Sequence, residues 1–201
     1  MKVYLATGNP HKCEEFGEMI HKFEVPVSLK SANEVGGMPE VEETGDTLHA
    51  NARLKGEALL KKVPQGSWVL ADDTGLLVDA LDGAPGVHSA RFAGLAGNAV
   101  ANNIKLLQLL KGLPLEKRTA RFSCVLFFAK AGMEGLFFEG TCEGHIMAAP
   151  SGVLGFGYDP LFQPLGYNKT FADLGSAVKN SLSHRGRAVA EWARHLQSMM
   201  D

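Results

Sequence analysis

The chain lacks several features from which a class of protein can be read directly. Its three cysteines, Cys13, Cys124 and Cys142, form no Cys-x-x-Cys pair and have no histidine at zinc-ligand spacing, so neither a zinc site nor a disulfide framework is indicated. No apolar run approaches the ~18 residues of a membrane span. The N-terminal segment reaches polar residues too early for a signal peptide. We therefore expect a cytoplasmic protein without membrane contact, with the cysteines acting as small buried apolar residues.

Two catalytic signatures and a basic excess are missing as well. There is no Gly-x-x-x-x-Gly-Lys phosphate loop and no Gly-x-Ser-x-Gly nucleophile motif. The net charge is −2, with 20 basic against 22 acidic residues, which argues against a protein that coats nucleic acid. Any role of the lysines and arginines therefore depends on where they lie, not on their number.

What the sequence does contain is a pattern of alternating strands and helices. The 201 residues, 45% of them hydrophobic, predict one domain over residues 1–201, with or without two lobes. Short apolar runs predict strands over 3–6, 25–29 and 68–71, and a hairpin over 119–129 and 136–146. Helical periodicity predicts helices that begin after Asn9 and that cover about 47–62, 98–111 and 183–199. This order indicates an α/β fold with a mixed sheet.

The first candidate site is the turn from the first strand into the first helix. It consists of Thr7, Gly8, Asn9, Pro10, His11 and Lys12. Amides at a helix N-terminus attract anions, and Lys12 would add a positive charge, so the turn could hold a phosphate. An ordinary turn with an Asn-Pro cap explains the same residues, and for this segment alone it is the better interpretation.

Acidic residues form the second candidate site. Asp72 and Asp73 follow a predicted buried strand, where adjacent carboxylates are costly unless they are paired, hydrated or metal-bound. We expect the strand to end there and only one of the two to face the site, because neighbours in a strand point to opposite faces. Glu42 and Glu43 would complete a carboxylate set suited to Mg²⁺, although alone they form an acidic loop.

Three further groups supply cations and rings. Lys55 lies with Asn51 on the apolar stripe of the predicted helix over 47–62, and a lysine in that place favours a cleft. The glycine-rich segment 155–160 carries two rings, which could stack on a base or anchor the loop in the core. Close to the last helix stand Lys179, His184 and Arg185, which could contact phosphate or a base carbonyl.

Taken in order, these segments resemble the inosine triphosphate pyrophosphatase family over nearly the whole chain. The most specific matches are Ala-Asp-Asp-Thr-Gly at 71–75, Gly-Phe-Gly-Tyr-Asp-Pro at 155–160 and Ser-His-Arg-Gly at 183–186. The resemblance implies a curved mixed sheet flanked by helices, two lobes with a central substrate cleft, and a homodimer. It implies Mg²⁺-dependent hydrolysis of the purine nucleoside triphosphates ITP, dITP and XTP to monophosphate and pyrophosphate.

The resemblance also implies roles for individual residues. Asp73 would be the catalytic proton acceptor and, with Glu42, a metal ligand. The residues that would bind the substrate are Thr7, Gly8, Asn9, Pro10, His11, Lys12, Lys55, Thr74, Phe156, Gly157, Tyr158, Asp159, Lys179, His184 and Arg185. The chain departs from the family pattern at Thr74, where serine is usual, and at Leu95, Ala96 and residues 175–178, where acidic residues are usual.

Two alternative functions differ in what they require of these residues. A Maf-like pyrophosphatase would act on pyrimidine or modified nucleotides, and the segments 155–160 and 183–186 argue against it. A non-catalytic nucleotide-binding protein would keep the cations but would not need Asp73 or Glu42, and both are present.

Overall fold

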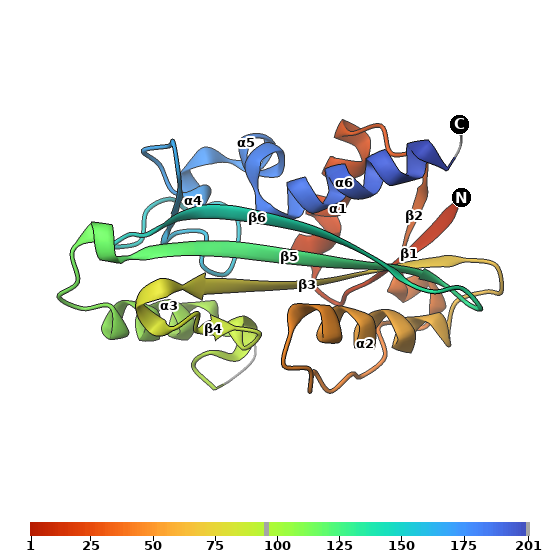
Figure 1. The fold of residues 1–201 in the computed structure, drawn as a ribbon, viewed down its shortest axis with the longest axis horizontal. Coiled ribbons are helices and arrows are strands. Elements are labelled where there is room, and N and C mark those ends of the chain that lie inside the picture. Colours follow the sequence, from red (N-terminus) through yellow and green to blue (C-terminus); the bar gives the residue numbers. More distant parts are fainter. Residues whose placement is uncertain (95–96, 200–201) are drawn as a thin grey trace. The chain divides into compact units, whose positions relative to one another are not determined.

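The computed structural model describes residues 1–94 and 97–199, so that Leu95 and Ala96 lie outside the described residues. The chain has an α/β fold with a mixed seven-stranded sheet (Figure 1), as the sequence predicts. The strands along the sheet follow the order β2-β1-β3-β5-β6-β7, and β4 pairs with β3. Strand β1 is parallel to both β2 and β3, whereas β4 and β7 pair antiparallel with β3 and β6.

The strands are β1 (Lys2–Ala6), β2 (Ser28–Ser31), β3 (Trp68–Val78), β4 (Pro85–Gly86), β5 (Thr119–Lys130), β6 (Leu136–Ile146) and β7 (Phe162–Pro164). The α-helices are α1 (Pro10–Lys22), α2 (Leu48–Leu60), α3 (Ala99–Leu109), α4 (Phe171–Leu174), α5 (Ser176–Leu182) and α6 (His184–Ser198). None of the helices within the described residues is long and apolar enough to cross a membrane.

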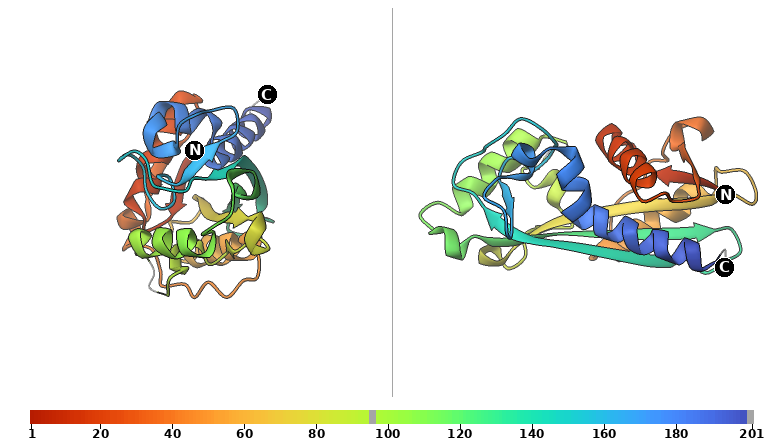
Figure 2. Two further views of the ribbon diagram at one scale, coloured as in Figure 1. Left: turned by 90° about the vertical axis from the view of Figure 1, so that its left-hand side faces the viewer. Right: turned by 90° about the horizontal axis from the view of Figure 1, so that it is seen from above.

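The chain divides into two compact units, and the first comprises residues 1–73, 124–140 and 185–201. Within this unit α1 and α6 cover one face of the strands and α2 covers the other (Figures 1 and 2). Phe16 of α1 and Trp192 of α6 pack with β1, β3 and β5 in one core. On the opposite face α2 approaches β5 closely, because a Cβ on Gly56 would lie 2.4 Å from the Phe127 ring. A larger residue than glycine would therefore push α2 away from the sheet.

The second unit comprises residues 74–123 and 141–184. Its core surrounds Phe122 of β5, which packs against Phe162 with 4.7 Å between the ring centroids. Leu106 and Leu110 of α3 and its C-terminal turn join this core, as does Phe171 of α4. Of the three cysteines, Cys124 and Cys142 are buried and Cys13 is partly buried, so the sequence prediction holds for two of them.

Two predicted boundaries are wrong. The strand expected to end at Asp72 and Asp73 continues through them to Val78. What does end at this point is β1, because its last residue, Ala6, pairs with Ala71 and leaves β3 without β1 from Asp72 onward. The second strand begins at Ser28 and not at residue 25. The other predicted elements agree with the structure to within about two residues, the usual uncertainty of element ends.

Candidate active site

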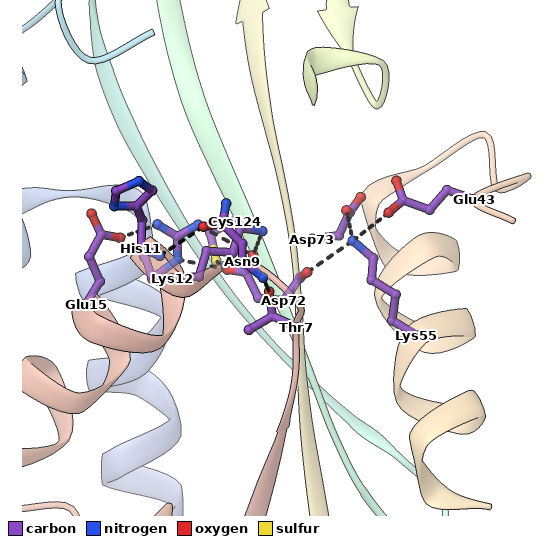
Figure 3. Close-up of polar contacts among 11 residues, drawn as sticks. Thr7, Asn9, His11, Lys12, Glu15, Glu43, Lys55, Asp72, Asp73 and Cys124 are labelled. Atoms are coloured by element: carbon purple, nitrogen blue, oxygen red, sulfur yellow. Dashed lines mark hydrogen bonds and ion pairs between the residues drawn. The ribbon is translucent and has the colours of Figure 1, made fainter. Parts of the chain in front are cut away.

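The buried carboxylate of Asp72 lies at the centre of a group of charged side chains in the first unit (Figure 3). Arg185, at the start of α6, donates from Nε to Asp72 Oδ2 at 2.9 Å, and Lys12 of α1 pairs with Oδ1. Glu15 of α1 accepts from Nη1 of Arg185 at 2.5 Å, and the thiol of Cys124 lies 3.2 Å from Asp72 Oδ2. The two acidic and two basic side chains balance, which is the condition for burying charge.

Local hydrogen bonds fix the turn that brings Lys12 to Asp72. Thr7 Oγ1 accepts from the amide of Asn9 at 3.1 Å, and Asn9 Oδ1 accepts from the amide of His11 at 3.0 Å. Asn9 is the N-cap of α1, and Pro10 is its first residue, as the sequence predicts. The turn is therefore a capped helix start that also carries a lysine held by a buried carboxylate.

On the opposite face of β3, Asp73 meets Lys55 of α2 (Figure 3). Lys55 Nζ lies 2.5 Å from Asp73 Oδ1, 3.2 Å from Glu43 Oε1 and 3.2 Å from the carbonyl oxygen of Asp72. The other carboxylate oxygen of Asp73, Oδ2, is buried and has no hydrogen-bond partner within the described residues. Asp73 thus keeps one oxygen paired with Lys55 and one available as an acceptor.

Burial and charge move the pKa values of these groups in opposite directions. Burial raises the pKa of Asp73 above its ordinary value, and the nearby Lys55 only partly offsets this. Burial alone would also raise the pKa of Asp72, but Arg185 and Lys12 hold it well below the usual range. For Lys55, burial would lower the pKa, yet the carboxylates of Asp73 and Glu43 outweigh it and raise the pKa. Lys55 therefore stays protonated, and Asp73 is the more basic of the two aspartates.

The residues around Lys55 suit a divalent cation of the Mg²⁺ type. Mg²⁺ prefers oxygen ligands and takes one or two protein carboxylates, completing its shell with water and substrate phosphate. Asp73 offers a buried carboxylate oxygen that has no hydrogen-bond partner among the described residues. The carboxylate of Glu43 contacts Lys55, the same lysine that pairs with Asp73. In the part of the chain that the structure describes, no group of three or more His, Cys, Asp or Glu side chains could hold a metal ion. Asp73 and Glu43 would therefore supply two of the oxygen ligands, and water and substrate phosphate would have to supply the rest.

In the second unit, the segment 155–160 is held in a tight turn. Asp159 Oδ2 accepts from the amide of Phe156 at 2.8 Å and from Lys179 Nζ at 2.6 Å. A Cβ on Gly155 would lie 2.1 Å from the same oxygen, so only glycine fits there. The Tyr158 hydroxyl donates to the carbonyl of Ser89 at 2.9 Å. These bonds leave Phe156 half-buried, with Lys179 Nζ 4.7 Å from the centre of its ring.

The structure distributes the predicted site residues over both units. Lys12, Lys55, Asp73 and the turn 7–11 belong to the first unit, together with the fully buried Arg185. The second unit contains Thr74, the residues Phe156, Gly157, Tyr158 and Asp159, the buried Lys179, and His184, whose ring stacks on Phe122 at 4.6 Å. Glu42, the predicted metal ligand, is exposed, and its neighbour Glu43 is the one beside Lys55.

Three contacts were not predicted from the sequence. They are the ion pair of Glu15 with Arg185, the pairing of Asp72 with Lys12 and Arg185, and the contact of the Cys124 thiol with Asp72. The position of Glu15, three residues after Lys12 and so on the same side of a helix, was a usable signal. No local pattern marks Cys124, because it meets Asp72 across 52 residues of sequence.

A capped helix start that carries a lysine and follows the carboxyl end of a strand in an α/β sheet is typical of proteins that bind phosphate-bearing ligands. The chain belongs to the Ham1 family, which residues 3–195 match. This membership confirms the resemblance drawn from the sequence motifs.

Proteins from several bacteria share this sequence over almost its whole length. The dITP/XTP pyrophosphatase of Opitutus terrae is 47% identical, with 96% of this chain and 99% of that protein covered. The dITP/XTP pyrophosphatase of Desulforamulus reducens is 49% identical, with 94% of this chain and 92% of that protein covered. The Staphylococcus aureus Ham1 structure is 36% identical and superposes with a TM-score of 0.85, covering 99% of this chain and 100% of that one.

Proposed function

We propose that this protein hydrolyses ITP, dITP and XTP to the nucleoside monophosphate and pyrophosphate. The relatives named as dITP/XTP pyrophosphatases share 47–49% of their residues with it and match almost full length. Within the chain, the observation that carries the proposal is Asp73, which pairs with Lys55 through one oxygen and keeps a second buried oxygen without a hydrogen-bond partner among the described residues.

Asp73 Oδ2 is the atom that would hold the attacking water. A carboxylate oxygen of raised pKa is a better proton acceptor than an ordinary aspartate, whose pKa is about 3.9. The water oxygen would attack the α-phosphorus, the bond from that phosphorus to the bridging oxygen of the β-phosphate would break, and pyrophosphate would leave. The proton lost by the water would pass to Asp73 Oδ2. Lys55 keeps Oδ1 in place and so orients Oδ2.

Charge on the phosphates requires positive partners. A bound Mg²⁺ would supply neutralisation of the phosphate oxygens, and we assign its protein ligands to Asp73 and Glu43, whose carboxylates both contact Lys55. Glu42, which the family resemblance implies as a ligand, stays a prediction. Lys12 and the amides at the start of α1 would bind the phosphates of the leaving group, since a helix N-terminus and a lysine both attract anions.

The remaining assignments also follow from the family resemblance. We propose that the half-buried ring of Phe156 stacks on the purine and that Thr74, Gly157, Tyr158, Asp159, Lys179, His184 and Arg185 contribute to the binding of base and phosphates. Asp159 and Lys179 form a buried pair, so their part is to hold the segment around Phe156 in shape. The central cleft and the homodimer likewise remain predictions.

The decisive experiment is a panel of nucleoside triphosphates assayed for pyrophosphate release with Mg²⁺ and with a chelator. We expect rapid, metal-dependent release from ITP, dITP and XTP and little from ATP. A site that donates a hydrogen bond to the 6-oxo group would leave that donor unpaired against the 6-amino group of adenine. Release only from pyrimidine nucleotides would favour the Maf-like alternative, and binding without release would favour a non-catalytic role.

A further inference from the structure

Asn51 of α2 is a fully buried polar residue of the first unit that the proposed reaction does not use. It precedes Lys55 by four residues, so that both side chains lie on the same side of the helix. Its side-chain oxygen accepts a hydrogen bond from the amide of Gly45 at 2.8 Å. Its side-chain nitrogen, Nδ2, has no hydrogen-bond partner within residues 1–94 and 97–199. A buried leucine at this position would carry no cost for desolvating a polar group. The asparagine differs from it by the hydrogen bond that it accepts from Gly45.

Gly45 ends the acidic loop of residues 42–45, and it fits closely against the start of α2. A Cβ on Gly45 would lie 2.6 Å from Asn51 Oδ1 and 2.6 Å from the Cβ of Ala50. Any side chain at this position would displace the backbone of the loop. The acidic loop is therefore attached to α2 by a contact that needs both a glycine on one side and a buried acceptor on the other.

This attachment lies two residues from Glu43, the carboxylate 3.2 Å from Lys55 Nζ. The ion pair is partly exposed, with 29% of the Glu43 side chain accessible, so on its own it would hold the loop weakly. The bond from Gly45 to Asn51 supplies a second, buried attachment on the same helix. Two attachments to one helix constrain the direction in which Glu43 points more than either contact would alone.

We propose that Asn51 is a positioning residue that holds the acidic loop on α2 and so places Glu43 for the divalent cation. The proposal rests on the proposed function, because it assigns the cation to Asp73 and Glu43. Residues that orient a metal ligand from outside the coordination shell commonly change metal affinity by about 10-fold to 100-fold when they are replaced. Asn51 and Gly45 act as a unit, and loss of either removes the same attachment.

The test compares Asn51→Leu, Gly45→Ala and the double variant with Glu57→Gln, a change on the exposed side of the same helix. The first readout is hydrogen exchange of the Gly45 amide in the protein without ligand, measured by NMR. The second is the Mg²⁺ concentration that gives half-maximal pyrophosphate release from dITP, together with kcat at saturating Mg²⁺. Thermal unfolding establishes that each variant is folded, and Gly45→Ala serves if Asn51→Leu fails to fold.

We expect the Gly45 amide to exchange faster in Asn51→Leu, and the Mg²⁺ requirement to rise about 10-fold or more in both single variants. The double variant should be no worse than the more severe single variant, because both changes break one contact. Much of the lost rate should return at saturating Mg²⁺, which a general loss of stability would not produce. Glu57→Gln should behave as the wild type.

An unchanged Mg²⁺ requirement in folded variants would overturn the proposal while leaving the proposed function intact, and so would unchanged exchange of the Gly45 amide in Asn51→Leu. A wild-type protein that releases no pyrophosphate with any Mg²⁺ concentration would overturn the proposed function and this inference with it.

Discussion

Asp72 and Asp73 are neighbours in β3, yet their carboxylates form ion pairs with basic side chains on opposite faces of the sheet. Asp72 meets Lys12 of α1 and Arg185 of α6, and Asp73 meets Lys55 of α2 (Figure 3). The alternation of side chains along a strand gives this separation directly. It also separates their environments, because Asp72 has no accessible side chain, whereas Asp73 keeps 8% of its side chain exposed and one oxygen without a hydrogen-bond partner among the described residues.

Replacement of Asp73 by asparagine should sharply reduce turnover and spare the fold, because Lys55 keeps Glu43 as an ion-pair partner. The amide keeps the shape of the side chain but accepts no proton from water, a role that contributes roughly 10²–10⁴-fold to rate. We expect kcat for dITP to fall by about that factor, with the thermal midpoint close to that of the wild type. Steady-state kinetics and calorimetry on the same preparation measure both quantities, and near-normal kcat in this variant would rule out Asp73 as the proton acceptor.

Replacement of Asp72 by asparagine should instead destabilise the protein. It removes the negative charge between the buried guanidinium of Arg185 and the partly buried ammonium of Lys12, and loss of one partner of a buried ion pair costs about 3–5 kcal/mol. The unfolding free energy from denaturant titration measures the effect. Asp79→Asn is the matched control, because Asp79 also pairs with an arginine, Arg121, but half of its side chain is exposed. That change should cost no more than about 1 kcal/mol. Equal costs for the two variants would contradict the central place of Asp72.

Asp72 should also give the stability a characteristic pH dependence. Its pKa is held well below the ordinary value of about 3.9 that it has in the unfolded chain, so the unfolded state takes up its proton first as pH falls. The stabilisation is complete above about pH 4–5 and is lost as pH falls toward the folded pKa. The raised pKa of Asp73 acts in the opposite sense. We expect the unfolding free energy of the wild type to decline more steeply in acid than that of Asp72→Asn, and parallel declines would refute this assignment.

Much of this arrangement follows from local sequence. The alternation of Asp72 and Asp73, the stripe that turns Lys55 inward, and the Asn9-Pro10 start of α1 each depend on residues close in sequence, where periodicity and capping rules apply. The continuation of β3 through two aspartates does not follow from local sequence. Asp72 is neutralised by Lys12 and Arg185, which are 60 and 113 residues away, so no local pattern reveals that a strand can pass there.

The acidic loop shows the same limit in another form. Between Glu40 and Thr47 the chain has no helix or strand and therefore no periodicity that would say which glutamate turns toward Lys55. The sequence left Glu42 and Glu43 equivalent, and the family resemblance favoured Glu42. The structure shows that Gly45 donates a hydrogen bond to the side chain of Asn51, six residues away, and no periodicity in the loop sequence predicts this contact.

The two glutamates therefore offer a direct comparison. Glu43→Gln removes the carboxylate 3.2 Å from Lys55, whereas Glu42→Gln changes an exposed residue of the same loop by the same atoms. If Glu43 holds the cation, its replacement should raise the Mg²⁺ concentration for half-maximal pyrophosphate release by about 10-fold or more, and Glu42→Gln should have a much smaller effect. Titration of Mg²⁺ in the dITP assay measures both. The reverse order would assign the ligand to Glu42 and would mean that the loop turns when the cation binds, because Glu43 is the residue that faces Lys55 in the structure.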